Sequence, residues 1–319
     1  MKNSLIILLG MGLLAKTPVG ADQKCGDFVY ESHDSAVTIT KYTGAGDVAV
    51  IPPTINDLQV TSIGRAAFAF CTNLSSVAIP KGVTHIGDEA FWGCTRLSSV
   101  TIPSSVANIG VCAFYLCGSL TNVAIPNGVS ILGKNAFGFC TNLTNATIPA
   151  SVTNFSYNPF VGCSRVAAIT VDAGNPAYSS VAGVLFSKDK TTLLECPGGK
   201  AGTYAIPNSV TSIFWEAFSY CHELVSITIP GSVTSIGCQA FSGCTGLTNV
   251  FFQGNCPSFY ENLSDDLFLG CSNNPTVYYL PNKTGWGTHV AGRPTVVWTT
   301  NSSNRTHRAS DAPRLILPN

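Results

Sequence analysis

The sequence has little charge. Only 11% of its 319 residues are Asp, Glu, Lys or Arg, with 17 of each sign, so the formal net charge is zero. A nucleic-acid-binding protein carries a basic patch or stripe, and this composition does not supply one. We therefore expect no nucleic-acid partner.

Long apolar runs are also absent after the first residues. Residues 1–21 carry Lys2, an apolar run over 5–14 and the small residues Val19-Gly20-Ala21, which predicts a secretory signal peptide cleaved after Ala21. No later run reaches the 18 or more apolar residues of a membrane-spanning helix. We expect no membrane insertion after cleavage, and a mature chain that is secreted, extracellular or at the cell surface.

Sequence motifs of catalysis and metal binding are missing as well. There is no G-x-S-x-G elbow, no H-E-x-x-H, no phosphate-binding loop and no C-x-x-C pair. The five histidines are scattered over different parts of the chain. We expect no catalytic residues, no cofactor and no metal, although an exported hydrolase whose residues meet only in space stays open as an alternative.

What the chain does have is a repeat. Phenylalanines recur at steps of 23 residues, and each is followed three residues later by a cysteine; the phenylalanines are Phe68, Phe91, Phe114, Phe137, Phe160 and, after a longer interval, Phe218 and Phe241. The unit reads A-F-x-x-C-x-x-L-x-x-V-x-I-P-x-x-V-x-x-I-G. A unit this short cannot enclose a core, so the units must stack.

Within each unit the V-x-I segment alternates and is rich in β-formers, which predicts one short strand that the following proline ends. Stacked strands predict a parallel β-sheet on one face, and the Ala-Phe-x-x-Cys stretch predicts a short helical or 3₁₀ turn on the other. The fold class is therefore a β-rich repeat solenoid.

Side chains alternate along a strand, so the residues flanking each buried strand position should point outward. These positions are small, uncharged and rich in hydroxyl and amide groups. The candidate partner-binding residues on them are Ser99, Thr101, Asn122, Asn145, Thr147, Thr170, Ser226, Thr228, Asn249 and Phe251.

The 23-residue step fails once, between Phe160 and Phe218, where one unit has gained 12 residues. In this extended unit at 172–205, residues 183–197 predict a hairpin, which we expect to form a flap outside the regular coil. Because insertions of this kind often map to a binding face, Lys188 and Lys190 in its turn join the candidate residues.

The predicted organisation has five segments. They are a signal peptide at 1–21, an N-terminal β cap at 22–58, the solenoid at 59–252, a C-terminal cap at 253–298 and a disordered tail at 299–319.

The 13 cysteines are predicted to be mostly free buried thiols, because seven of them occupy one repeat position and Cys is among the most commonly buried residues. Among the others, Cys256 and Cys271 are the first pair to test for a bridge. Aromatic residues also recur between Phe and Cys, and we expect most of them to pack between coils; they are Phe70, Trp92, Tyr115, Phe139 and Tyr220.

The unit, as in "IPKGVTHIGDEAFWGCTRLSSVTIP", resembles the BspA-type class of leucine-rich repeats over roughly residues 51–252. The resemblance implies a right-handed coil and a curved solenoid used for adhesion or protein binding, with no catalytic residues to carry over. It favours a secreted or cell-surface, non-enzymatic protein that binds an extracellular protein or glycan. A structural envelope or matrix protein without a specific ligand is the other alternative.

Overall fold

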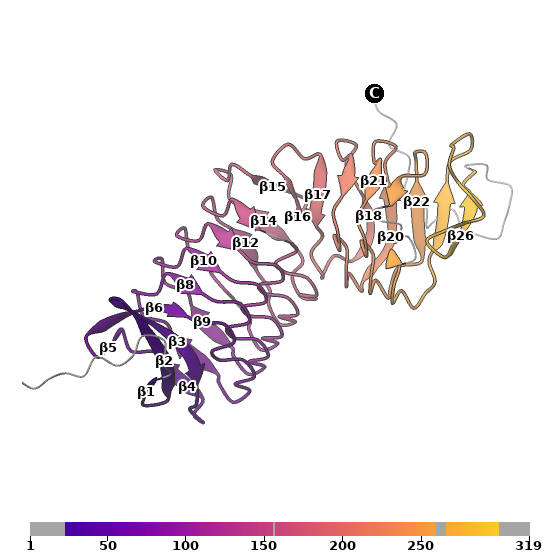
Figure 1. Ribbon diagram of the computed structural model, residues 1–319. Helices are drawn as coiled ribbons and strands as arrows, with labels where there is room; N and C mark the ends of the chain where they lie inside the picture. The colour runs from indigo at the N-terminus through magenta and orange to yellow at the C-terminus, as the bar shows by residue number, and fades with distance from the viewer. Residues whose placement is uncertain (1–22, 156, 260–265, 300–319) are drawn as a thin grey trace, which may run out of the picture.

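The computed structural model describes residues 23–155, 157–259 and 266–299. The predicted signal peptide at 1–21 and the tail beyond Thr299 lie outside the described residues. The chain forms an elongated stack of coils with a bend, and β1 (Gln23–Cys25) and β26 (Arg293–Val297) lie at opposite ends (Figure 1).

The predicted V-x-I strands are present in every described repeat except the one with Val123 and Ile125, and they pair in parallel, as in Val77↔Val100. They form three sheets, because residues 122–124 form no strand and the extended unit interrupts the series. The strands are β4 (Val48–Val50), β7 (Ser76–Ala78), β9 (Ser99–Thr101), β12 (Ala146–Ile148), β14 (Ile169–Val171), β18 (Gly202–Ala205), β20 (Leu224–Ile229), β22 (Asn249–Phe252) and β24 (Thr276–Tyr279), with β26 and β25 (His289–Val290) at the end.

A second series of parallel strands, which the sequence pattern did not predict, lies at the I-G segment that ends each unit. Most of these strands have two residues, too few for an alternating pattern to show in the sequence. They are β6 (Leu58–Ile63), β8 (His85–Ile86), β10 (Asn108–Ile109), β11 (Ile131–Leu132) and β13 (Asn154–Phe155), then β17 (Thr192–Glu195), β19 (Ser212–Ile213), β21 (Ser235–Ile236) and β23 (Ser258–Phe259).

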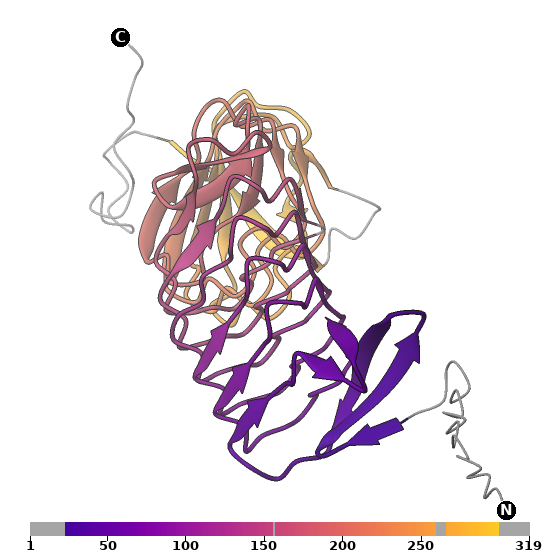
Figure 2. The same cartoon turned by 90° about the vertical axis from the view of Figure 1, so that its left-hand side faces the viewer.

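The N-terminal strands β1, β2 (Phe28–His33) and β3 (Ala36–Tyr42) form an antiparallel unit at one end of the stack (Figure 2). Strand β3 then pairs in parallel with β6, which also forms a small antiparallel pair with β5 (Thr54–Ile55). The second series of strands therefore continues into the N-terminal cap without a break.

The expected helical turns are wrong. The Ala-Phe-x-x-Cys stretches form turns. The residues two before and two after the repeated Phe take a left-handed backbone, except before Phe160; Ala66 and Phe70 have φ of 54° and 58°. Their amides point along the stack, so that Phe68 N donates to Ala90 O at 2.7 Å and Phe70 N donates to Trp92 O at 2.6 Å. A helix cannot form because these N–H groups bond the next coil instead of their own.

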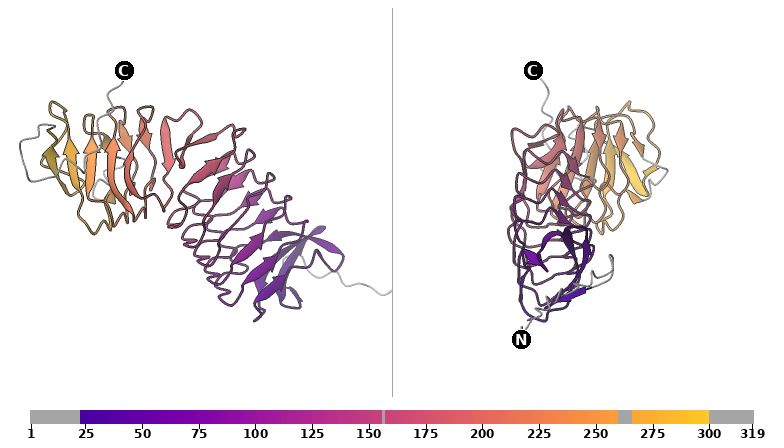
Figure 3. Two further views of the ribbon diagram at one scale, coloured as in Figure 1. Left: turned by 180° about the vertical axis from the view of Figure 1, so that it is seen from behind. Right: turned by 60° about the vertical axis from the view of Figure 1, so that its left-hand side comes forward.

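The repeated phenylalanines form a buried column. Phe91 and Phe114 stack with ring centroids 5.0 Å apart and an interplanar angle of 7°, and the column runs from Tyr42 through Phe68 to Phe160 and resumes at Phe218. The apolar core divides into two clusters at β16 (Val184–Ser187), with Leu185 in the first and Phe186 in the second. This division coincides with the bend, which is also visible from behind (Figure 3).

The extended unit contains the predicted hairpin, formed by β16 and β17 and preceded by β15 (Tyr178–Val181). It is not a flap outside the coil. Val184, Leu185, Phe186 and Leu193 are fully buried, and β17 continues in parallel with β19. The apolar residues of the hairpin place it in the core, because leaving them in water would cost about 1.5 to 3 kcal/mol for each large side chain.

Candidate binding surface

The outward positions of the V-x-I strands form a surface that we call the outer face. In the first half of the stack six candidate residues on it are exposed to solvent: Ser99, Thr101, Asn122, Asn145, Thr147 and Thr170. The strands hold them one coil apart, and the only recorded side-chain bond between two of them joins the hydroxyls of Thr147 and Thr170 at 3.0 Å. These six residues present hydroxyl and amide groups without charge over several coils.

The second half of the outer face differs from the prediction. Ser226 and Thr228 on β20 are 2% and 7% exposed, and Phe251 on β22 is 7% exposed, so these three are not open to a partner. Phe251 belongs to an aromatic cluster in which its ring lies 4.9 Å from both Tyr278 and Trp298. Asn249 is half-buried, and its side-chain amide donates to the Thr248 hydroxyl.

The structure does not bring Lys188 and Lys190 together with the outer face. Both are exposed in the turn between β16 and β17, and β17 belongs to the second series of strands. The Lys188 ammonium donates to the backbone carbonyl of Asn175, so it is held against its own extended unit. Asp189 between them accepts from the hydroxyls of Ser187 and Thr191, which lowers the pKa of its carboxyl.

The aromatic residues between Phe and Cys form a second row, parallel to the buried column. Ring centroids lie 5.9 Å apart for Phe70 and Trp92, 5.7 Å for Trp92 and Tyr115, 5.3 Å for Tyr115 and Phe139, and 4.7 Å for Phe139 and Tyr220. The last contact spans the extended unit. Phe70 is 66% exposed at the start of the row, whereas the rest are half-buried. The expectation of packing between coils agrees with these contacts.

Sequence reasoning missed the surface of the second series of strands. His85 and Asn154 are exposed there, as is Ile131 at 40%. The sequence could have indicated this surface, because each of these three residues lies two positions before the last residue of its repeat unit.

A shallow hollow of about 240 Å³ lies beside Phe70 and is also lined by Tyr42, Thr43 and Cys71. Burial raises the pKa of the Cys71 thiol, which disfavours the nucleophilic thiolate. The lining of this hollow includes no acidic or basic side chain.

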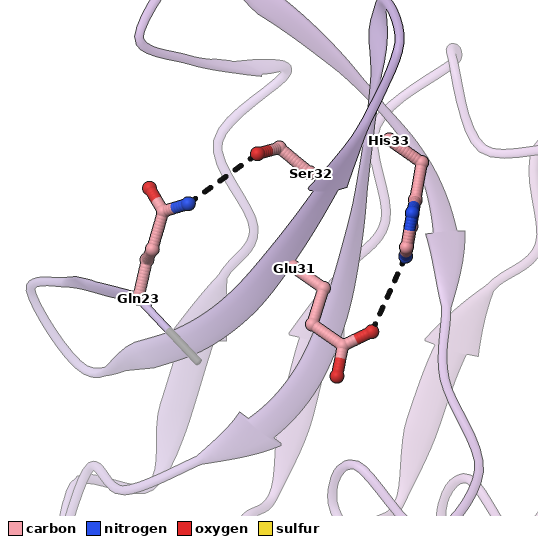
Figure 4. A network of polar contacts seen from close by, with 4 residues as sticks. All are labelled: Gln23, Glu31, Ser32 and His33. Carbon is pink, nitrogen blue, oxygen red and sulfur yellow. Dashed lines mark hydrogen bonds and ion pairs between the residues drawn. The ribbon is translucent and has the colours of Figure 1, made fainter. Parts of the chain in front are cut away.

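Polar contacts also occur on the N-terminal strands (Figure 4). Gln23 donates from its amide to the Ser32 hydroxyl at 3.3 Å, and the His33 ring lies 3.4 Å from the Glu31 carboxylate. The His33 side chain is 54% exposed, so this pair contributes little to stability. It has the character of an ordinary surface contact.

Among residues 23–155, 157–259 and 266–299, no group of three His, Cys, Asp or Glu side chains is placed to hold a metal ion. The same residues include no helix of the length and apolar character needed to cross a bilayer.

The sequence matches the family described as BspA type leucine rich repeat region, in six copies, over residues 53–177 and 200–289. The chain belongs to this family. The match leaves out the middle of the extended unit, where the structure also departs from the regular coil. No functionally curated protein matches the sequence.

Two solved structures with TM-scores above 0.5 support the fold. A leucine-rich repeat protein from Eubacterium ventriosum is 24% identical, with a TM-score of 0.60, covering 80% of this chain and 77% of that one. The pneumococcal vaccine antigen PcpA is 18% identical, with a TM-score of 0.57, covering 89% and 100%. A leucine rich cell surface protein from Faecalibacterium prausnitzii is 26% identical, with a TM-score of 0.49, covering 90% and 96%.

Proposed function

We propose that this protein is a secreted or cell-surface, non-enzymatic binding protein that captures an extracellular protein or glycan. The observation that carries the proposal is the exposed outer face of β9, β12 and β14 with the Asn122 coil between them. Its hydroxyl and amide groups are spaced by one strand separation, about 4.8 Å. Such a surface supplies many weak hydrogen bonds to an extended partner, which is how solenoids are generally used.

Two further features support this proposal. The predicted signal peptide at 1–21 favours export. Thiols in the buried column have raised pKa values, which makes them poor nucleophiles and favours a structural role for them.

The test measures binding of the mature chain to immobilised oligosaccharides and to purified extracellular-matrix proteins by biolayer interferometry. The variant carries Asn145→Arg and Thr147→Arg on the outer face, and the control carries Asn154→Arg, which is exposed on β13 in the same coil. We expect saturable binding that the double variant weakens at least about tenfold, or about 1.4 kcal/mol, and that the control leaves unchanged.

No saturable binding to any probe would support the structural envelope or matrix role instead. Equal binding by the double variant and the native chain would remove the outer face from the proposal.

The hairpin is tested by point substitution. Deleting residues 183–197 would remove buried Leu185 and Phe186 and damage the core. Lys188→Ala and Lys190→Ala instead leave the buried residues in place, although Lys188→Ala also removes the hydrogen bond to the Asn175 carbonyl. If these two changes weaken binding as much as the outer-face variant does, the binding surface extends to the second series of strands.

A further inference from the structure

The row of aromatic residues between Phe and Cys begins at Phe70 with one side of the ring open. Each later ring contacts the ring before it in the row. Phe70 has no such ring before it among the described residues. Towards the next coil it lies against Gly93, where a Cβ would come within 2.7 Å of the Phe70 ring. Phe70 is 66% exposed, because the preceding coil does not cover it.

The N-terminal cap leaves a space on this open side. Tyr42 begins the buried column by stacking on Phe68, with centroids 5.1 Å apart. Gly44 follows Tyr42 by two residues, as Phe70 follows Phe68, so the cap has no side chain where the next coil has a ring. Gly44 lies between β3 and β4 at the N-terminal end of the stack (Figure 1). Gly44 and Phe70 both line the hollow of about 240 Å³.

Uncharged polar groups surround the exposed ring. Thr72 and Asn73 line the hollow and are exposed, and the Thr72 hydroxyl and the Asn73 side-chain amide have no partner among the described residues. The Thr43 hydroxyl donates to the Asp27 carbonyl at 3.0 Å, which leaves its oxygen able to accept. None of the described residues that line the hollow is acidic or basic. A ligand therefore meets one apolar ring and several neutral donors and acceptors.

These groups favour a ligand ring with an apolar face and a polar edge. A pyranose sugar has C–H groups on its faces and hydroxyls around its edge, so its face can lie on Phe70 while its hydroxyls bond the neighbouring groups. An aromatic side chain of a partner brings few polar groups and would leave most of these donors and acceptors without a bond. The Asp27 carboxylate lies close to Gly44, where a Cβ would be 2.8 Å from its Oδ2 atom, and it disfavours an acidic sugar.

We propose that the hollow beside Phe70 binds one neutral pyranose residue, which stacks on the Phe70 ring and extends the aromatic row by one member. Hydroxyls of the sugar bond Thr43, Thr72 and Asn73. The hollow is smaller than the roughly 300 to 1,000 Å³ of pockets for drug-sized ligands, so one sugar ring fills it and the Kd lies in the millimolar range. The site is separate from the outer face and does not rest on the proposed function.

The test titrates the mature chain at pH 7 with the methyl glycosides of glucose, galactose, mannose and N-acetylglucosamine by saturation-transfer difference NMR. We expect saturable binding of at least one of them. Phe70→Ala should raise its Kd at least about fivefold, because the stacking surface is lost, and Phe70→Tyr should keep the Kd within about twofold. Leu116→Ala is the matched control and should leave the Kd unchanged, because Leu116 takes the same repeat position and is 40% exposed.

Two further variants separate the site from packing and from the outer face. Asn73→Ala keeps the ring, so it tests the site even if Phe70→Ala disturbs the contact with Trp92, and it should raise the Kd about threefold. Asn145→Arg with Thr147→Arg lies three coils away and should bind the sugar as the native chain does. The two proposals therefore succeed or fail separately.

Four results would overturn the inference. They are no saturable binding of any of the four glycosides, an unchanged Kd in both Phe70→Ala and Asn73→Ala, equal weakening by Leu116→Ala, and binding of methyl glucuronide as tight as that of methyl glucoside.

Discussion

Glu195 is a carboxyl group in the core at the point where the repeat changes length. One of its oxygens accepts from Phe160 N at 3.0 Å, and the other has no partner among the described residues. The backbone N–H of Cys196, the next residue, donates to Ala217 O, and the Cys221 thiol lies 3.7 Å from the Cys196 carbonyl oxygen. The repeated Phe makes these two contacts in other coils, so Cys196 occupies the Phe position here. The N–H of Phe160 therefore donates to the Glu195 side chain, whereas the N–H of the repeated Phe in other coils donates to a backbone carbonyl of the next coil.

Burial raises the pKa of Glu195 well above its ordinary value of 4.5, with the Phe160 N–H opposing and Glu216 adding to the increase. Because the folded-state pKa is above the unfolded one, this contribution to stability is fully present below about pH 4.5 and is lost as pH rises through the folded-state pKa. We expect Glu195→Gln to remove that decline, measured by urea unfolding at several pH values. Identical pH profiles for the two chains would contradict this account.

The repeated cysteines hydrogen-bond along the stack. Cys94, Cys117 and Cys140 each donate from the thiol to the carbonyl of the Phe 26 residues earlier, at 3.0 to 3.2 Å. The structure has all 13 cysteines as free thiols, including Cys256 and Cys271. A small, buried donor is therefore what this repeat position requires.

Burial raises the pKa of Cys94 to about 12, and the thiolate is the reactive form. With iodoacetamide at pH 8 we expect rapid modification of exposed Cys25 and none of Cys94 until the chain unfolds, as followed by peptide mass spectrometry. Equal modification rates of Cys25 and Cys94 in the folded protein would show that the repeated thiols are accessible to the reagent.

At the scale of the element, the turn that ends each unit depends on close backbone contact. A Cβ at Gly110 would lie 2.6 Å from the carbonyl carbon of Gly87, and one at Gly133 would lie 2.3 Å from that of Gly110. Backbone atoms cannot move aside as the end of a side chain can. The repeated Gly therefore allows successive coils to approach at the second series of strands.

We expect Gly110→Ala to destabilise the protein by about 2 to 3 kcal/mol, because the coils must separate to admit a methyl group. The matched control is Gly118→Ala, where the only neighbour is the Thr141 hydroxyl at 3.7 Å. The control should change the free energy of unfolding by less than about 0.5 kcal/mol. Chemical denaturation of both variants measures the difference, and equal costs would contradict the role of close approach.

The elements also show what the sequence can reveal. The V-x-I strands are predictable because alternation, β-formers and a terminating Pro agree over several residues. The second series is not, since a pair such as Asn108–Ile109 is too short to carry a period. The left-handed backbone at Glu89 and Cys112 is equally hidden, because neither residue type favours φ above zero. On the candidate surface, exposure of Thr101 follows from local alternation, whereas the equivalent Thr228 is only 7% exposed, which the same alternation does not predict.

The whole molecule is a one-dimensional stack in which the strands of each coil pair with those of the next coil. The Phe139 and Tyr220 rings contact each other across the extended unit, although the buried column of Phe rings is interrupted there by Cys196. Stability is then approximately a sum over coils and the interfaces between them.

Removing one complete coil should therefore be tolerated. Deletion of residues 95–117 joins Cys94 to Gly118, which restores the sequence order found after Cys117. We expect a folded chain with a lower melting temperature, measured by circular dichroism. Deletion of 95–105 is the control, because it shifts every later residue out of register, and it should abolish cooperative unfolding; a folded control would contradict simple stacking.

The thirteen unbridged thiols have a kinetic consequence. The finished fold needs no cross-link, so reductant should leave its melting temperature unchanged. Before the coils close, however, the same sulfur atoms are available for incorrect pairing in any oxidising compartment. Burial of each thiol as its coil closes takes it out of reach of the others, so we expect conditions that slow folding to increase the fraction of wrongly disulfide-bonded chains.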